Sequence, residues 1–221
     1  MSKDLKQWKN MLNAEQIAHG MNLATANSVR LLKDAEILFE AGSYPTAFSL
    51  AVLAIEEAGK VSILRELAVA RDGKEVKEAW RAYRSHTRKN VMWLFPSLVQ
   101  SGSKTLSEFK ALFSDDADHP MMLDDLKQIG FYTDCLGTRH WSVPDEIIDK
   151  MSTKNILSVA RVLCKERSYS KREIELWIKH IKPVWKSPTP LMQDALKYWY
   201  KQMVKEGLAA EGAMSFDDFI D

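Results

Sequence analysis

The segment from residue 45 to residue 70 constrains the fold of this chain more than any other. Its run AFSLAVLAI has a helical pattern and is apolar on almost every side. A helix without a polar face has to be covered all round by other elements. We therefore predict that this helix is the central element of a helical bundle.

The flanking sequence supplies helices to cover it. Apolar residues recur at alternating gaps of three and four between residues 14 and 38, which predicts a long helix before the central one. Gly42 and Pro45 are typical of a helix C-terminus and a first helical turn, so the connection is short. Strand patterns are nearly absent. Further helices are predicted over residues 74–99, 153–167, 170–182 and 189–206.

These elements predict an all-α protein. A helical bundle is expected over residues 1–170, and a C-terminal helical extension over residues 171–221 is expected to pack on or near it. The final residues, 215–221, are expected to form a frayed acidic tail.

The amino-acid composition limits the functions that the chain can have. The formal net charge is only +1, so affinity for nucleic acid has to come from a local basic patch. Two cysteines in 221 residues favour a reduced, intracellular setting over a disulfide framework. We expect a cytoplasmic protein with no signal peptide, no membrane span and no cofactor. A glycine-rich phosphate loop, a nucleophile elbow and an HExxH motif are all missing from the sequence.

One stretch is a local basic patch. Residues 80–90, WRAYRSHTRKN, hold four cations and one histidine within the helix predicted over residues 74–99. The guanidinium of Arg81 could hold a phosphate in two places, and the imidazole of His86 could move a proton on or off a ribose 2′-hydroxyl. The plainer alternative is a solvated basic helix face. If the stretch binds RNA, the remaining contacts are expected from Arg84, Arg88, Lys89 and Asn90.

Two carboxylates interrupt the apolar central helix. Glu56 and Glu57 belong to AIEEAGK, residues 54–60, and Lys60 could pair with Glu56 one turn later. A buried charge is costly unless it has a partner, and the basic stretch is a nearby source of cations. We predict that these three residues orient Arg81 or His86. A purely structural ion pair is the alternative.

A metal site is not predicted. The acidic segment at residues 114–120 and the following Asp124 and Asp125 offer oxygen ligands, but in no spacing typical of a metal centre. A loop is the better interpretation of this segment.

Four motifs in series resemble one protein family. They are AGSYPTAFSLAVLAIEEAGK at residues 41–60, HTRK at 86–89, LKQIGFYTD at 126–134 and WSVP at 141–144. Together they are similar to the AbiV-type abortive-infection proteins, a bacterial branch of the HEPN helical domains. The resemblance covers roughly residues 15–170.

The resemblance implies a compact HEPN-like bundle that forms a homodimer and defends bacteria against phage. Many HEPN domains are metal-independent endoribonucleases with an Arg-x4–6-His motif, and this places the catalytic pair at Arg81 and His86. A two-fold axis could bring the Arg81 of one copy near the His86 of the other. RNA or the translation machinery is the implied target, and a phage protein the trigger. Ala82 follows the arginine where HEPN nucleases often carry a polar residue, and some HEPN proteins only bind. The alternative is therefore a non-catalytic protein that blocks translation by occupying a phage or host factor.

Overall fold

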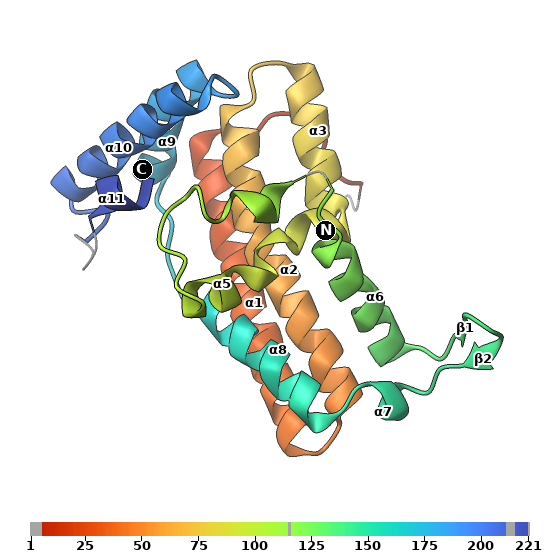
Figure 1. Ribbon diagram of the computed structural model, residues 1–221. Coiled ribbons are helices and arrows are strands. Elements are labelled where there is room, and N and C mark those ends of the chain that lie inside the picture. The colour runs from red at the N-terminus through yellow and green to blue at the C-terminus, as the bar shows by residue number, and fades with distance from the viewer. Residues whose placement is uncertain (1–5, 115, 211–214, 221) are drawn as a thin grey trace.

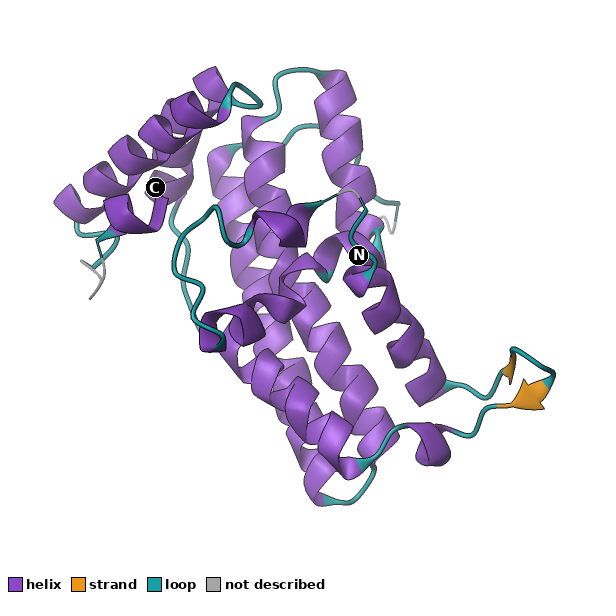
Figure 2. Ribbon diagram, in the orientation of Figure 1, coloured by secondary structure: helices purple, strands orange, loops and turns teal. Residues whose placement is uncertain are grey.

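The computed structural model describes residues 6–114, 116–210 and 215–220 of the chain. Its helices wrap around one another, and a small hairpin projects from the body (Figures 1 and 2). In chain order the elements are α1 (Ala14–Glu40), α2 (Tyr44–Val69), α3 (Gly73–Arg84), α4 (His86–Lys89), the 3-10 helix η1 (Val91–Leu94), α5 (Phe95–Gln100), the 3-10 helix η2 (Lys110–Phe113), α6 (His119–Phe131), β1 (Cys135–Leu136), β2 (His140–Trp141), α7 (Pro144–Ile147), α8 (Lys150–Leu163), α9 (Lys171–Ile181), the 3-10 helix η3 (Lys182–Val184), α10 (Thr189–Lys205) and α11 (Phe216–Ile220).

Helix α2 is the centre of the bundle. It runs antiparallel to α1 and also packs against α3, α4, α6, α8 and α9 (Figure 1). Two apolar clusters form around it, one with α6 and α8 and the other with α3 and α9. The predicted all-α fold and the central place of the apolar helix are confirmed.

The prediction of a single helix over residues 74–99 is wrong. Helix α3 ends at Arg84, and Ser85 adopts an extended backbone with φ −79° and ψ 131°. The Ser85 side chain then accepts a hydrogen bond from the backbone N–H of Arg88, so it caps a new helix, α4. Pro96 does not kink a long helix, because it lies in the first turn of α5, where proline is tolerated.

Two more short elements differ from the sequence prediction. The stretch before Pro144 contains the antiparallel pair β1–β2, with Cys135 opposite Trp141 and Leu136 opposite His140. The predicted frayed tail is instead helix α11 over the part of it that the structure describes. Its Ile220 is buried, and the Phe219 carbonyl accepts a hydrogen bond of 2.7 Å from the Leu106 backbone.

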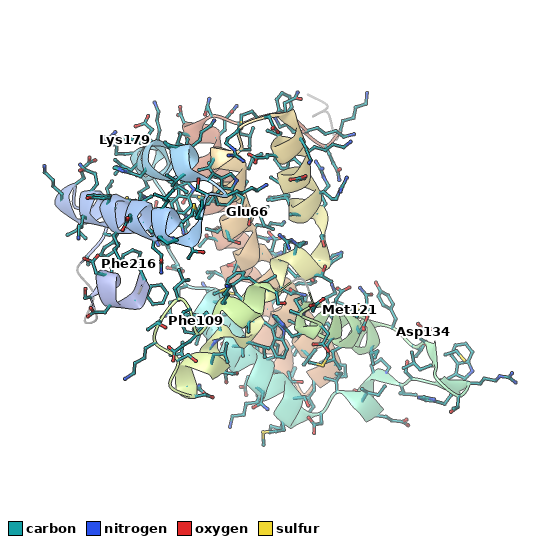
Figure 3. The ribbon with its side chains drawn as sticks, turned by 45° about the horizontal axis from the view of Figure 1, so that its top comes forward. Glu66, Phe109, Met121, Asp134, Lys179 and Phe216 are labelled. Carbon is teal, nitrogen blue, oxygen red and sulfur yellow. The ribbon has the colours of Figure 1, made fainter. Side chains whose placement is uncertain are left out.

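The C-terminal helices lie along one end of the bundle. Helix α9 packs on α1 and α2, and α10 packs on α9. The Trp177 indole of α9 donates a hydrogen bond of 3.1 Å to the Arg65 carbonyl of α2 and meets the ring of Trp199 edge-on. An aromatic contact between Phe109 and Phe219 joins α11 to the loop after α5, and Figure 3 shows Phe109 near Phe216 of the same helix. In the described part of the chain, no helix combines the length and apolar character needed to cross a membrane.

Candidate functional site

Glu56 of α2 lies at the centre of a charged cluster. Its side chain is 2% exposed, and one carboxylate oxygen accepts from Lys127 Nζ of α6 at 2.7 Å. The other oxygen lies 2.6 Å from His86 Nδ1 and 3.1 Å from Lys89 Nζ, both of α4. A buried carboxylate therefore collects three nitrogen groups from two other helices. Glu56 has the cationic partners that were predicted for it. They come from the basic stretch over residues 80–90 and also from α6.

Two glycines let those helices reach α2. A Cβ on Gly59 of α2 would lie 2.1 Å from the backbone oxygen of Lys89. A Cβ on Gly130 of α6 would lie 2.3 Å from Ser49 Oγ of α2. Neither distance is tolerable for a real side chain, so both close approaches require glycine. Gly59 of AIEEAGK thus lets α4, and with it His86, pack against Glu56.

The His86 ring is held on one side and open on the other. The side chain is 51% exposed, although Nδ1 faces the buried Glu56. An ionised carboxylate only accepts hydrogen bonds, so Nδ1 donates to Glu56 in the tautomer that carries its proton there, and Nε2 points away from this contact. Within the described chain, no residue hydrogen-bonds to Nε2. The break at Ser85 produces this orientation, because His86 begins a helix with a direction of its own.

Lys127 completes the charge balance. Its ammonium bonds to both Glu56 and Asp124, and it lies 3.3 Å from His86 Nδ1. The ligand atoms of Glu56, His86 and Asp124 lie within 4.8 Å of one another, which is close enough to surround a cation. The lysine ammonium already bonds both carboxylates there, and Lys89 and Lys127 bring two positive charges to the two carboxylates. This donor set suits Lys127 better than a metal ion.

The other arginines of the basic stretch point elsewhere. Arg81 is exposed and its side chain makes no hydrogen bond or ion pair within the described ranges. Arg84 donates to the Trp8 carbonyl at 2.7 Å and lies over the Trp80 ring. Arg88 is exposed, whereas Lys89 and Asn90 are buried.

Glu57 and Lys60 form their own pair. They bond to each other, and the Lys60 ammonium lies 5.1 Å from the centre of the Tyr83 ring. The predicted pairing of Lys60 with Glu56 is not the one observed. This pair borders α3 rather than the His86 ring.

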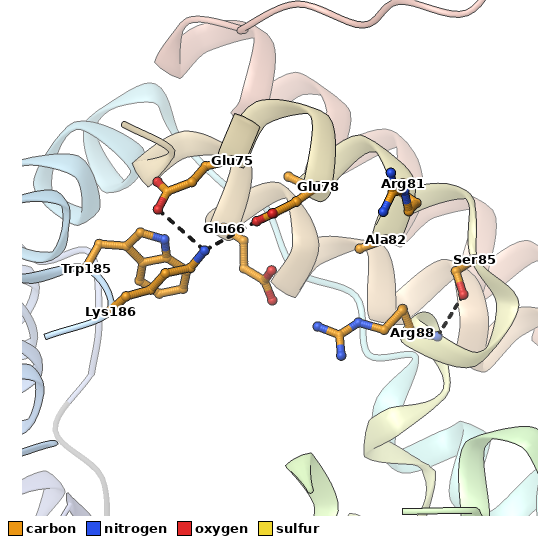
Figure 4. A pocket seen from close by; sticks show the side chains of 10 residues that line it. Glu66, Glu75, Glu78, Arg81, Ala82, Ser85, Arg88, Trp185 and Lys186 are labelled. Carbon is orange, nitrogen blue, oxygen red and sulfur yellow. Dashed lines mark hydrogen bonds and ion pairs between the residues drawn. The ribbon is translucent and has the colours of Figure 1, made fainter. Parts of the chain in front are cut away.

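Two hollows flank Arg81. One, of about 490 Å³, is lined by four cations and no carboxylate: Lys9, Lys77, Arg81 and Arg84, with Trp80 and Ser85. The other, of about 410 Å³, lies between α2, α3 and the segment after η3, and Figure 4 shows its side chains. His86 lines neither hollow, so within one chain Arg81 and His86 face different spaces.

Sequence reasoning did not place Lys127 or Asp124 in this cluster. A signal was present, because LDDLKQIG sets Lys127 one turn after Leu123 and three residues before Gly130, on the face that packs against α2. A lysine between two buried positions of one helix face indicates a buried carboxylate partner.

Comparison with protein families identifies the family to which the chain belongs. The AbiV model of the HEPN group matches residues 16–165. The chain belongs to the AbiV family. The matched range contains Glu56, His86, Lys89 and Lys127, so the whole charged cluster belongs to the AbiV domain, and membership indicates an abortive-infection HEPN protein. Comparisons with curated proteins and with solved structures gave no match.

Proposed function

We propose that this AbiV protein is a metal-independent endoribonuclease that acts as a homodimer in phage defence. The observation that carries the proposal is the His86 ring, held 2.6 Å from the buried Glu56 with half of its surface open. A carboxylate that fixes the tautomer and orientation of an imidazole, leaving Nε2 accessible, is a common arrangement for proton transfer.

In the proposed reaction His86 Nε2 takes the proton of a ribose 2′-hydroxyl. The 2′-oxygen attacks the adjacent phosphorus, and the bond from phosphorus to the 5′-oxygen breaks. The departing 5′-oxygen takes a proton from water, and His86 returns its proton to the hydroxide so formed, which leaves a 2′,3′-cyclic phosphate on one fragment and a 5′-hydroxyl on the other. Glu56 is a positioning residue here, and Lys127 and Lys89 hold its carboxylate in place.

Arg81 is proposed to stabilise the charge that develops on the phosphate. Its guanidinium has no internal partner among the described residues, so it is available to a phosphate. Since Arg81 and His86 face different spaces in one chain, we assign this role to the Arg81 of a second copy. Arg84 and Lys77 line the same cationic hollow and extend a path for the RNA backbone. Lys89, being buried, acts in this scheme by bonding to Glu56, and Asn90 is buried away from the RNA.

The test compares wild type with His86→Ala on total bacterial RNA, with EDTA present and the cut ends mapped. His19→Ala, an exposed histidine of α1, is the matched control. Wild type and the control should leave cyclic-phosphate ends, and His86→Ala should leave none while folding normally. Equal cleavage by His86→Ala, or cleavage that EDTA stops, would refute the proposal.

The dimer is tested by mixing two inactive variants. In a mixed dimer of Arg81→Ala and His86→Ala, one composite site keeps both wild-type residues only if the pair acts across the interface. Cleavage restored by mixing is the expected result. Two variants that stay inactive together would place both residues in one chain's site, and an Arg81→Ala variant that cuts on its own would remove Arg81 from the reaction.

A second candidate function rests on an exposed apolar surface. Met121 and Met122 of α6, Tyr132 and the hairpin residue Trp141 are between 49% and 71% exposed. Large exposed apolar side chains are typical of protein interaction sites where they lie together. A non-catalytic AbiV protein would lose phage protection on Trp141→Ser and would leave RNA uncut. Protection that survives Trp141→Ser would exclude this candidate.

A further inference from the structure

The hollow between α2, α3 and the segment after η3 contains three charged groups without partners. Glu66 of α2, Arg81 of α3 and Arg88 of α4 all line it, and their side chains make no hydrogen bond or ion pair with any residue the structure describes. Figure 4 shows Glu66 facing the space between Trp185 and Arg88. The two arginines lie on the side of the hollow away from the tryptophan.

The other charges of the hollow are already satisfied. Lys186 lies 3.4 Å from a Glu75 oxygen and 3.5 Å from a Glu78 oxygen. Glu75 also accepts from Arg71, which lowers its pKa to about 2. Lys186 reaches this position with a left-handed backbone, φ 60°, which also turns the preceding Trp185 toward the hollow. The C-terminal segment is therefore fixed over α3, and Glu66 is left as the free carboxylate of the hollow.

An unpartnered carboxylate in a partly buried site is unfavourable for folding. Burial raises the pKa of Glu66, while the more distant charges of Arg88 and Lys186 act in the opposite direction. Glu66 is only partly buried, so its oxygens remain open to solvent and to a ligand in the hollow. A ligand that enters the hollow replaces the water around these groups, so it has to supply hydrogen-bond donors to Glu66, a flat surface for Trp185 and negative charge for the arginines.

A nucleotide has these three features. Its base can stack on an indole, and its phosphates can bond to arginines. Guanine is the RNA base whose Watson–Crick edge carries two neighbouring N–H donors, at N1 and at the exocyclic amino group. A carboxylate has two oxygens that accept such a pair side by side. Adenine, cytosine and uracil each present an acceptor next to a donor there, which would face Glu66 with a lone pair.

We propose that this hollow binds a guanine nucleotide of the RNA, with its base stacked on Trp185 and paired to Glu66, and its flanking phosphate held by Arg88. This assignment rests on the proposed nuclease function. Glu66 and Glu56 are ten residues apart on α2, about 15 Å along the helix axis. Ser85, which lines the hollow, directly precedes His86. The bound guanine therefore lies within a few nucleotides of the bond that His86 cuts, and it sets the sequence preference of cleavage.

The first test is equilibrium binding of GMP, AMP, CMP and UMP to the full chain by calorimetry. GMP should bind about tenfold more tightly than the others, since its two donors bond to a charged acceptor. Glu66→Gln should remove that preference, and Glu40→Gln, an exposed glutamate at the end of α1, should keep it. Trp185→Leu should weaken all four nucleotides alike. Equal binding of the four nucleotides by wild type, or a GMP preference unchanged in Glu66→Gln, would overturn the proposal.

The second test maps cut sites on RNA, where guanine should occur at one fixed distance from the cut with wild type and not with Glu66→Gln. The two proposals fail separately. If GMP binds in a Glu66-dependent way but RNA stays intact, the guanine site stands and the nuclease does not. If cleavage depends on His86 but ignores guanine and Glu66, the nuclease stands and the guanine site does not.

Discussion

Helix α2 carries two carboxylates, Glu56 and Glu66, that lie ten residues apart in opposite surroundings. Glu56 is 2% exposed and bonds to nitrogen atoms of His86, Lys89 and Lys127. Glu66 is half-buried and has no such partner, and its pKa is raised by burial. Both lie in the same wrapped helix, so the difference is set by what neighbouring helices bring to each.

The comparison distinguishes charges that hold other side chains in place from charges that are free to bind a ligand. A buried charge that is fully paired contributes to folding and holds its partners, so changing it should disturb the fold and His86 together. A charge left unpaired contributes little to folding, and its removal should affect only what binds there. The same distinction holds between Lys127, which is buried and paired, and Arg81, which is exposed and unpaired.

The largest effect is expected when Glu56 and Glu66 are each replaced by glutamine. Glu56→Gln leaves Lys89 and Lys127 with reduced compensation in the interior, and the free energy of unfolding should fall by about 3 kcal/mol. Glu66→Gln should leave it within about 0.5 kcal/mol of wild type. Urea denaturation followed by circular dichroism measures both. Equal losses in the two variants would remove the distinction.

A smaller loss of stability is expected when Gly59, which lets α4 approach α2, is replaced. Gly59→Ala places a Cβ against the Lys89 backbone oxygen, and the overpacking should destabilise the protein by about 1–3 kcal/mol. Gly20→Ala is the matched helical control, because its Cβ would meet only the flexible Leu64 side chain at 3.4 Å. That variant should be neutral or about 0.5 kcal/mol more stable. Thermal unfolding of both distinguishes them, and a Gly59→Ala variant as stable as wild type would mean that α4 is not held by this contact.

The exposed arginine should change binding without changing the fold. Arg81→Ala should weaken the binding of a labelled RNA by roughly 1 kcal/mol and reduce the slope of log affinity against log salt by about one. Arg161→Ala, an exposed arginine of α8 paired with Glu36, is the control and should do neither. Fluorescence anisotropy at several salt concentrations gives both slopes. Identical slopes for the two variants would remove Arg81 from the RNA path.

The smallest effect is a pH dependence at Glu66. Its pKa is higher in the folded than in the unfolded chain, so the folded state binds more protons and stability falls as pH rises through this range. Wild type should therefore be slightly less stable than Glu66→Gln at pH 7, by about 0.5 kcal/mol or less, and the difference should shrink toward pH 4. Denaturation at both pH values measures it. A wild type that gains on the variant as pH rises would mean that Glu66 has a cationic partner after all.

Much of the fold could be predicted because the sequence of α2 is apolar on almost every side. A helix without a polar face has to be central, and its carboxylates had to find cations. The break at Ser85 could not be predicted, since serine is tolerated inside helices and the cap depends on α4 packing against Gly59. Lys127 lies 71 residues beyond Glu56, and only the fold brings them together. Trp185 reaches the hollow through the left-handed turn at Lys186, which leaves no pattern in the sequence.

Chemical rescue tests whether His86 transfers a proton during RNA cleavage. His86→Gly is incubated with RNA and EDTA, with and without added imidazole, which can enter because the histidine ring is half exposed. Imidazole should restore cleavage with cyclic-phosphate ends at the wild-type positions. A folded His86→Gly variant that cuts without imidazole, or that stays inactive at every imidazole concentration while wild type cuts, would contradict proton transfer by His86.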